Sequence, residues 1–174
     1  SDLAGSTLVC DVVGNLVHRD RLQPAGPIFV ARRPTAEQTL EFFASRDPAF
    51  RPVGVELGPD GALYLIDMQR DVIEHPDYIP QKVKEHLNLR AGEDRGRIYR
   101  LTPRGGLKPV QVNLGKAADA DLVNLLGHSN QWWRLTAQRL LVQRHATGVV
   151  DKLEAIVQGP NPLATLHALW ALQG

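Results

Sequence analysis

The sequence predicts an α+β chain in two parts, an antiparallel β-rich region over residues 1–104 and a helical region over 117–174, joined by a linker at 105–116. Ten of the 12 prolines and 11 of the 15 glycines precede position 117, which is typical of short elements separated by turns. All four Phe and all three Tyr lie in that part, whereas all three Trp follow it. The last part also repeats itself at a fixed spacing, which is typical of paired helices.

Composition excludes several classes of protein. The 20 Lys and Arg nearly balance the 19 Asp and Glu, so we expect neither a nucleic acid nor an anionic membrane surface as the main partner. No apolar stretch approaches the roughly 18 residues that insert into a bilayer, and the first residues do not resemble a signal peptide. Cys10 is the single cysteine, which rules out an intrachain disulfide and c-type haem attachment, and we expect it to be a small buried hydrophobe.

The clearest element is a β-hairpin over Val53–Asp67. Its two apolar runs flank Gly58-Pro59-Asp60-Gly61, in which proline presets a turn, aspartate caps it and glycine supplies a positive φ. Four further strands are predicted, at Thr7–Val12, Leu16–Arg19, Ile28–Ala31 and Arg97–Leu101.

Two connections receive different predictions. Residues 35–43 suggest a short helix with Thr35 as N-cap and Gln38 completing a capping box. Residues 71–94 are polar and irregular, with one helical turn expected over 81–87, and a connection of that length is often functional.

The helical part contains a 31-residue repeat. Leu125–Asn130 recurs as Ile156–Asn161, and each copy reads as a helix, a short break and a second helix. We expect Trp133, Ala137, Leu140 and Leu141 on the core face, while Arg134, Gln138 and Gln143 point away. Paired helices at a fixed period predict an α-solenoid, and because two units are few, a neighbour should cover the exposed face.

Five segments carry a family resemblance: Gly14–Arg19, Ser45–Val53, Gly58–Pro76, Leu89–Arg100 and Trp133–Arg139. On these segments the chain resembles the membrane-bound dehydrogenase family of planctomycete-type bacteria, which has a six-bladed β-propeller similar to soluble quinoprotein sugar dehydrogenases, followed by HEAT-like helices. The resemblance implies propeller blades up to about Leu101, HEAT-like repeats after them, and a periplasmic or cell-envelope location.

The length limits what the resemblance implies. A propeller has at least four blades of roughly 40–50 residues, and the β-rich part can supply only about two. We therefore expect an incomplete propeller that the rest of a parent protein, or another chain, completes. The implied function is a portion of a quinoprotein-like dehydrogenase that oxidises a sugar or alcohol with pyrroloquinoline quinone (PQQ).

Arg51 is the first cofactor-binding candidate. It matches the first arginine of an Arg-x-Arg pair that, in the related glucose dehydrogenases, contacts the quinone carboxylates ahead of a hairpin, while Val53 replaces the second. A guanidinium suits this role because it binds a carboxylate bidentately. The alternative is an arginine that pairs with an acidic residue at a propeller rim.

A polar loop after the hairpin supplies the catalytic candidates. His75 and Asp67 could act as acid and base in removing a hydroxyl proton, and Arg70 could contact the cofactor. Carboxylate oxygens of the same loop could instead bind calcium, or the loop could be solvated and internally paired. The cluster consists of Asp67, Arg70, Asp71, Glu74, His75 and Asp77.

His18 and Arg19 follow the same reasoning. They could line a central channel as cofactor-binding residues, or they could pair with Asp11 or Asp20. The alternative function for the whole chain is a non-catalytic module that binds protein or glycan. Convergence of the candidate arginine, aspartate and histidines on one concavity would favour the enzyme, and scattering would favour the module.

Overall fold

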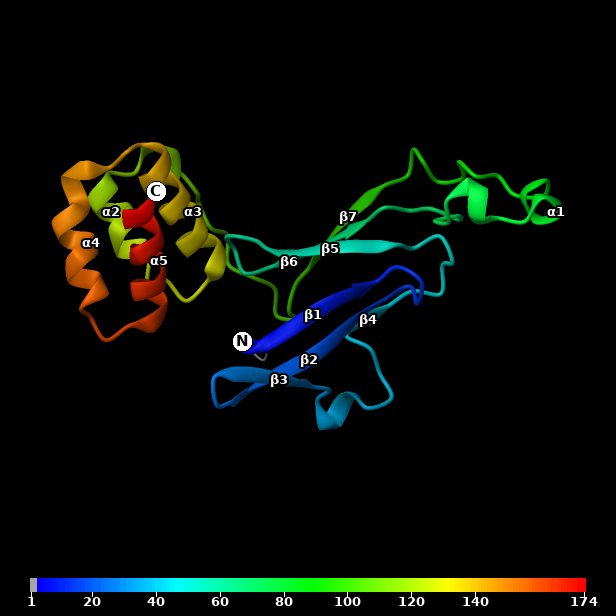
Figure 1. The fold of residues 1–174 in the computed structure, drawn as a ribbon, viewed down its shortest axis with the longest axis horizontal. Helices are drawn as coiled ribbons and strands as arrows, with labels where there is room; N and C mark the ends of the chain where they lie inside the picture. Colours follow the sequence, from blue (N-terminus) through cyan, green and yellow to red (C-terminus); the bar gives the residue numbers. More distant parts are fainter. Residues whose placement is uncertain (1–2) are drawn as a thin grey trace. The chain divides into compact units, whose positions relative to one another are not determined.

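A computed structural model describes residues 3–174, which form two units. The first comprises the residues up to 56 together with 64–101, and the second comprises 57–63 together with 102–174. The tip of the predicted hairpin therefore belongs to the second unit. Figure 1 labels the elements of each unit along the chain.

The first unit contains a four-stranded antiparallel sheet. Strand β2 (Leu16–Ala25) lies between β1 (Ser6–Asp11) and β3 (Ile28–Arg32), and the short β4 (Phe43–Ala44) also pairs with β2. The strands predicted in this region are confirmed, although β2 is longer than expected. A two-residue turn joins β2 to β3, where Gly26 has a φ of +63° that suits the first position of a type II′ turn.

A three-stranded sheet follows, in the order β5-β6-β7. The predicted hairpin is confirmed as β5 (Pro52–Leu57) and β6 (Leu63–Asp67), and β7 (Arg97–Leu101) lies beside β6. Asp60 accepts the N–H of Ala62 through its side chain at 3.0 Å, which closes the turn as its residue types predict.

Aromatic side chains form the core of the first unit. The rings of Phe43, Phe50 and Tyr99 lie within 5.6–6.2 Å of one another, measured between centroids. Val17 from β2 and Leu65 from β6 are buried with Phe50 in the same cluster. Cys10 lies against this cluster, and burial raises the pKa of its thiol.

The connections of the first unit differ in how well the sequence predicted them. The helix expected over residues 35–43 is wrong, because only the 3₁₀ turn Thr35–Glu37 forms and its N-cap is Pro34. Gln38 instead donates from its side chain to the carbonyls of Arg33 and Pro34. Residues 71–94 are mostly irregular, and the expected helical turn is confirmed as α1 (Gln81–Lys84), preceded by a 3₁₀ turn at Pro76–Tyr78.

The second unit contains four α-helices. They are α2 (Asp119–Leu125), α3 (Gln131–Gln143), α4 (Val150–Val157) and α5 (Pro162–Gln173), with 3₁₀ turns at Leu114–Lys116 and Thr147–Val149. Asn130 and Asn161, the last residues of the repeated segments, cap α3 and α5 by accepting main-chain N–H groups. Ala137 and Ala168, which are equivalent in the repeat, are both fully buried.

The predicted fold class is wrong. Residues 3–174 contain two separate antiparallel sheets and five helices, with no closed barrel or propeller. The α-solenoid is not shown either, because one shared core takes side chains from α2, α3, α4 and α5. The 31-residue repeat therefore corresponds to two helix pairs, α2–α3 and α4–α5, that share one core.

Candidate functional site

Asp67 ends β6 as a fully buried carboxylate. Its Oδ1 accepts the main-chain N–H groups of Arg51 at 2.8 Å and Gln69 at 2.9 Å. Its Oδ2 has no hydrogen-bond partner, although Nε of Arg97 lies 3.4 Å away, close enough for an ion pair without hydrogen-bond alignment. The carboxylate therefore holds two main-chain segments together, which is a structural role for the predicted catalytic residue.

Arg51 and Arg70 bind main-chain carbonyls. Every guanidinium nitrogen of Arg51 already donates, from Nε to Arg70, from one terminal nitrogen to Val12 and from the other to Asp71. Arg70 donates to the carbonyls of Gln69 and Gly92. Three of the five N–H groups of Arg51 are thus taken by main-chain carbonyls, and binding of a quinone carboxylate by these arginines stays a prediction.

The loop after β6 packs closely against residues 90–93. A Cβ on Gly92 would lie 2.4 Å from the carbonyl oxygen of Gln69, so only glycine permits this approach, and Gly92 has a φ of +87°. Gln69 itself has a φ of +53°. The residues around Arg70 are therefore joined to residues 90–93 by close main-chain contacts.

His75 lies elsewhere in the same loop. Its side chain is 65% exposed, its Nδ1 accepts the N–H of Asp77 at 3.3 Å, and its ring is 5.6 Å from that of Tyr78. No contact recorded among the described residues joins His75 to Asp67 or Arg51. The pairing of His75 with Asp67 as acid and base stays a prediction.

His18 forms a third, separate group on the four-stranded sheet. Its Nδ1 lies 2.9 Å from Glu41 and its Nε2 lies 3.2 Å from Asp20. The hydrogen bond to Glu41 and the charge of Asp20 raise the pKa of His18 against the opposing effects of burial and Arg33. Arg19 pairs with Glu37 at 3.1 Å. The pairing alternative expected for His18 is thus present, with Asp20 as one partner.

No hydrogen bond or ion pair among the described residues joins all of the candidate residues. Arg51, Arg70 and Asp67 lie together, while His75 and His18 each have their own partners. Nor does the described part of the chain contain a group of three or more His, Cys, Asp or Glu side chains that could hold a metal ion. None of the helices in residues 3–174 is long and apolar enough to cross a membrane.

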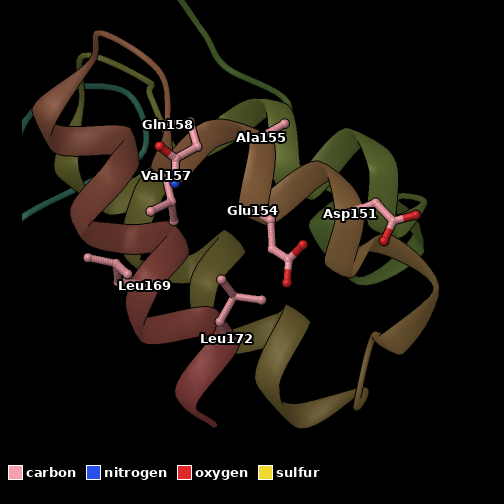
Figure 2. A pocket seen from close by; sticks show the side chains of 7 residues that line it. All are labelled: Asp151, Glu154, Ala155, Val157, Gln158, Leu169 and Leu172. Atoms are coloured by element: carbon pink, nitrogen blue, oxygen red, sulfur yellow. The ribbon is translucent and has the colours of Figure 1, made fainter.

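Sequence reasoning missed a groove between α4 and α5. Its volume is about 510 Å³, and Figure 2 shows Glu154 from α4 and Leu172 from α5 projecting into the same opening. The sequence held one signal for it, because the segment Pro162–Gln173 is apolar on all sides and cannot bury every face in a four-helix unit. The lining residues are Asp151, Glu154, Ala155, Val157, Gln158, Leu169 and Leu172.

Comparison with known families identifies a family for the β-rich part of the chain. Residues 1–105 match a family described as a domain of unknown function, DUF7133. The chain belongs to the DUF7133 family. The match includes Arg51, Asp67, His75 and His18, whereas the groove between α4 and α5 lies outside the matched residues. No curated protein and no solved structure matches the chain.

Proposed function

We propose that the chain is a non-catalytic protein-interaction module. Its second unit, residues 57–63 and 102–174, is called the helical unit below, and it binds a basic amphipathic helix in the groove between α4 and α5. The observation that carries this proposal is the groove itself, which combines exposed leucines with carboxylates. Arg51, His18 and His75 each contact their own partners and no described contact joins them, which favours this module over the dehydrogenase that the family resemblance implies.

The apolar part of the surface comes from α5. Ala164, His167 and Ala168 face the core, yet large apolar side chains also cover the opposite side of the helix. Their exposed fractions run from 36% to 54% within a 12-residue helix, and an exposed apolar surface of this kind marks an interaction site. The exposed residues are Leu163, Leu166, Leu169, Trp170 and Leu172.

The charged part comes from α4. Asp151 and Glu154 are exposed and line the groove, and the described lining residues include no Lys or Arg. A partner with cationic side chains beside its apolar anchors would neutralise these carboxylates, whereas an acidic partner would be repelled. An amphipathic helix supplies both features, because residues at i, i+3, i+4 and i+7 form one apolar stripe flanked by charge.

A pair of designed peptides tests the proposal. One is an amphipathic helix of leucine and lysine, about 18 residues long so that it can become helical on binding, and the other carries glutamate in place of lysine. Fluorescence anisotropy of the labelled peptides should show binding of the lysine peptide by the full chain and little binding of the glutamate peptide. Changing Leu169→Ser together with Leu172→Ser should weaken binding of the lysine peptide by roughly tenfold or more.

Two further variants distinguish binding in the groove from non-specific binding to exposed apolar side chains. Leu135→Ser on α3 removes a leucine of similar exposure (47%) that does not line the groove, and its affinity should equal that of the unchanged chain. Asp151→Lys with Glu154→Lys should reverse the preference between the two peptides. Equal binding of the lysine peptide to the groove and control variants would eliminate the proposal.

A further inference from the structure

The hairpin made by the end of β2 and by β3 leaves one edge open. Within residues 3–174, β3 pairs only with β2, and residues 21–29 are all exposed. The apolar side chains on this hairpin include Leu22 at 40%, Ile28 at 62% and Phe29 at 66% exposure. A two-stranded hairpin is marginally stable by itself in water, so pairing of a further strand with this edge would stabilise the hairpin.

The ladder register identifies which main-chain groups face that edge. The N–H of Leu22 donates to the carbonyl of Gly5 at 2.8 Å, on the β1 side, so the main-chain groups of Leu22 point away from β3. Bonded and non-bonded pairs alternate in an antiparallel ladder, so Ala31, opposite Leu22, directs its N–H and C=O to the open edge. Phe29 does the same, which agrees with its partner Pro24, a residue without an N–H.

We propose that this edge pairs with β3 of a second copy of the chain, in an antiparallel arrangement with its two-fold axis at Val30. Phe29 of each copy then lies opposite Ala31 of the other. Each such pair exchanges two main-chain hydrogen bonds, so the two strands form four, and two four-stranded sheets become one continuous sheet.

The side chains fit this register on both faces. On one face the large ring of Phe29 lies beside the small Ala31 of the other copy. On the opposite face Val30 meets Val30, and Ile28 meets Arg32, so the register sets no like charges directly opposite each other. A symmetric partner must be complementary to itself, and the sequence Ile28–Arg32 meets that condition. Because the ladder is short, the dimer is weak and depends on protein concentration.

Disulfide trapping tests the register directly. Residues of a non-bonded antiparallel pair have Cα atoms about 4.5 Å apart, within the range of roughly 4.4–6.8 Å that a disulfide spans. In a Cys10→Ala background, Val30→Cys should therefore cross-link readily into a dimer under mild oxidation. Ile28→Cys alone should not, because its opposite residue is Arg32, yet a mixture of Ile28→Cys and Arg32→Cys chains should cross-link to each other.

Sedimentation velocity of the full chain supplies the second measurement. The unchanged chain should show a dimer that grows with concentration, and Ala31→Pro should abolish it, because proline removes an edge N–H without removing a bond within the hairpin. Val9→Lys, a change of an exposed valine on β1, should leave the dimer intact. A monomer at every concentration would overturn the proposal. So would a dimer that survives Ala31→Pro, or a Val30→Cys chain that cross-links no faster than Ile28→Cys.

Discussion

Arg134 on α3 donates from its Nε to Nε2 of His167 on α5, across 3.2 Å inside the helical core. Nδ1 of the same imidazole lies 2.7 Å from the side-chain oxygen of Gln138, so the neutral ring carries its proton on Nδ1 and donates it there. Another guanidinium nitrogen donates to the carbonyls of His128 and Ser129. Burial lowers the pKa of Arg134, and no carboxylate pairs with it among the described residues.

We predict that Arg134→Met destabilises the helical unit by about 1–3 kcal/mol. Methionine fills similar volume, but it leaves two part-buried carbonyls and a buried imidazole nitrogen without their donor. Urea unfolding followed by tryptophan fluorescence measures the loss, since all three tryptophans belong to the helical unit. Arg139→Met, which removes an exposed contact to Gln143, should change the free energy of unfolding by less than about 0.5 kcal/mol.

The two asparagine caps should differ in importance. Asn161→Ala removes the acceptor for the first turn of α5 and should cost about 0.5–2 kcal/mol. Asn130→Ala should cost more, because Asn130 caps α3 and also donates from Nδ2 to the carbonyl of Gly58 at 2.9 Å. Asn130→Asp keeps the capping oxygen and loses the donor, so its stability should lie between that of Asn130→Ala and that of the unchanged chain. Equal losses for the two alanine variants would contradict this account.

Local sequence patterns predicted many of the strands, turns and helices, although not the fold class. Turn chemistry located the β5–β6 hairpin because Asp60 and Gly61 act within four residues, and helical spacing correctly placed Ala137 and Leu141 in the core. The same spacing wrongly predicted Arg134 on the outer face of α3. In the structure Arg134 is buried, with only 8% of its surface exposed. Its burial depends on the carbonyls and imidazole of other segments, which periodicity within one helix does not encode.

The sequence predicted which residue lies beside Asp67, while the role of Asp67 as an acid or base stays a prediction. Arg51 and Asp67 do lie together, as a shared hairpin requires, but the carbonyls that occupy Arg51 come from residues up to 39 positions away. Local pattern alone could not distinguish propeller blades from two separate sheets. Each predicted strand fits many sheets, and only the long-range pairing between strands distinguishes them.

We predict that Arg51→Met lowers the free energy of unfolding of the first unit by about 2–4 kcal/mol. The variant loses three hydrogen bonds from a charged donor and leaves the carbonyls of Val12, Arg70 and Asp71 unpaired by protein. Hydrogen exchange of β6 and β7 should accelerate accordingly. Arg95→Met, whose side chain is 76% exposed, is the matched control and should leave exchange unchanged. Normal exchange in Arg51→Met would show that the arginine has no structural role.

The two units should respond to pH in opposite directions. The raised pKa of His18 means that its contribution to stability is complete below about pH 6.5 and is lost as the pH rises through that raised value. The pKa of His167 is lowered, first by burial and second by the charge of Arg134, so its contribution is complete above about pH 6.5 and is lost as the pH falls. Tryptophan-monitored urea unfolding should therefore show a helical unit that weakens from pH 7.5 to 5.5.

Matched substitutions assign each slope to its histidine. His167→Gln should flatten the pH dependence of tryptophan-monitored unfolding, while His145→Asn in the same unit should not. His18→Gln should leave that signal unchanged, because the tryptophans report the other unit, and should instead abolish the loss of protection in β2 as the pH rises through the neutral range. If hydrogen exchange of β2 in the unchanged chain is independent of pH after correction for the intrinsic rate, the ion pairs of His18 with Glu41 and Asp20 do not stabilise the sheet.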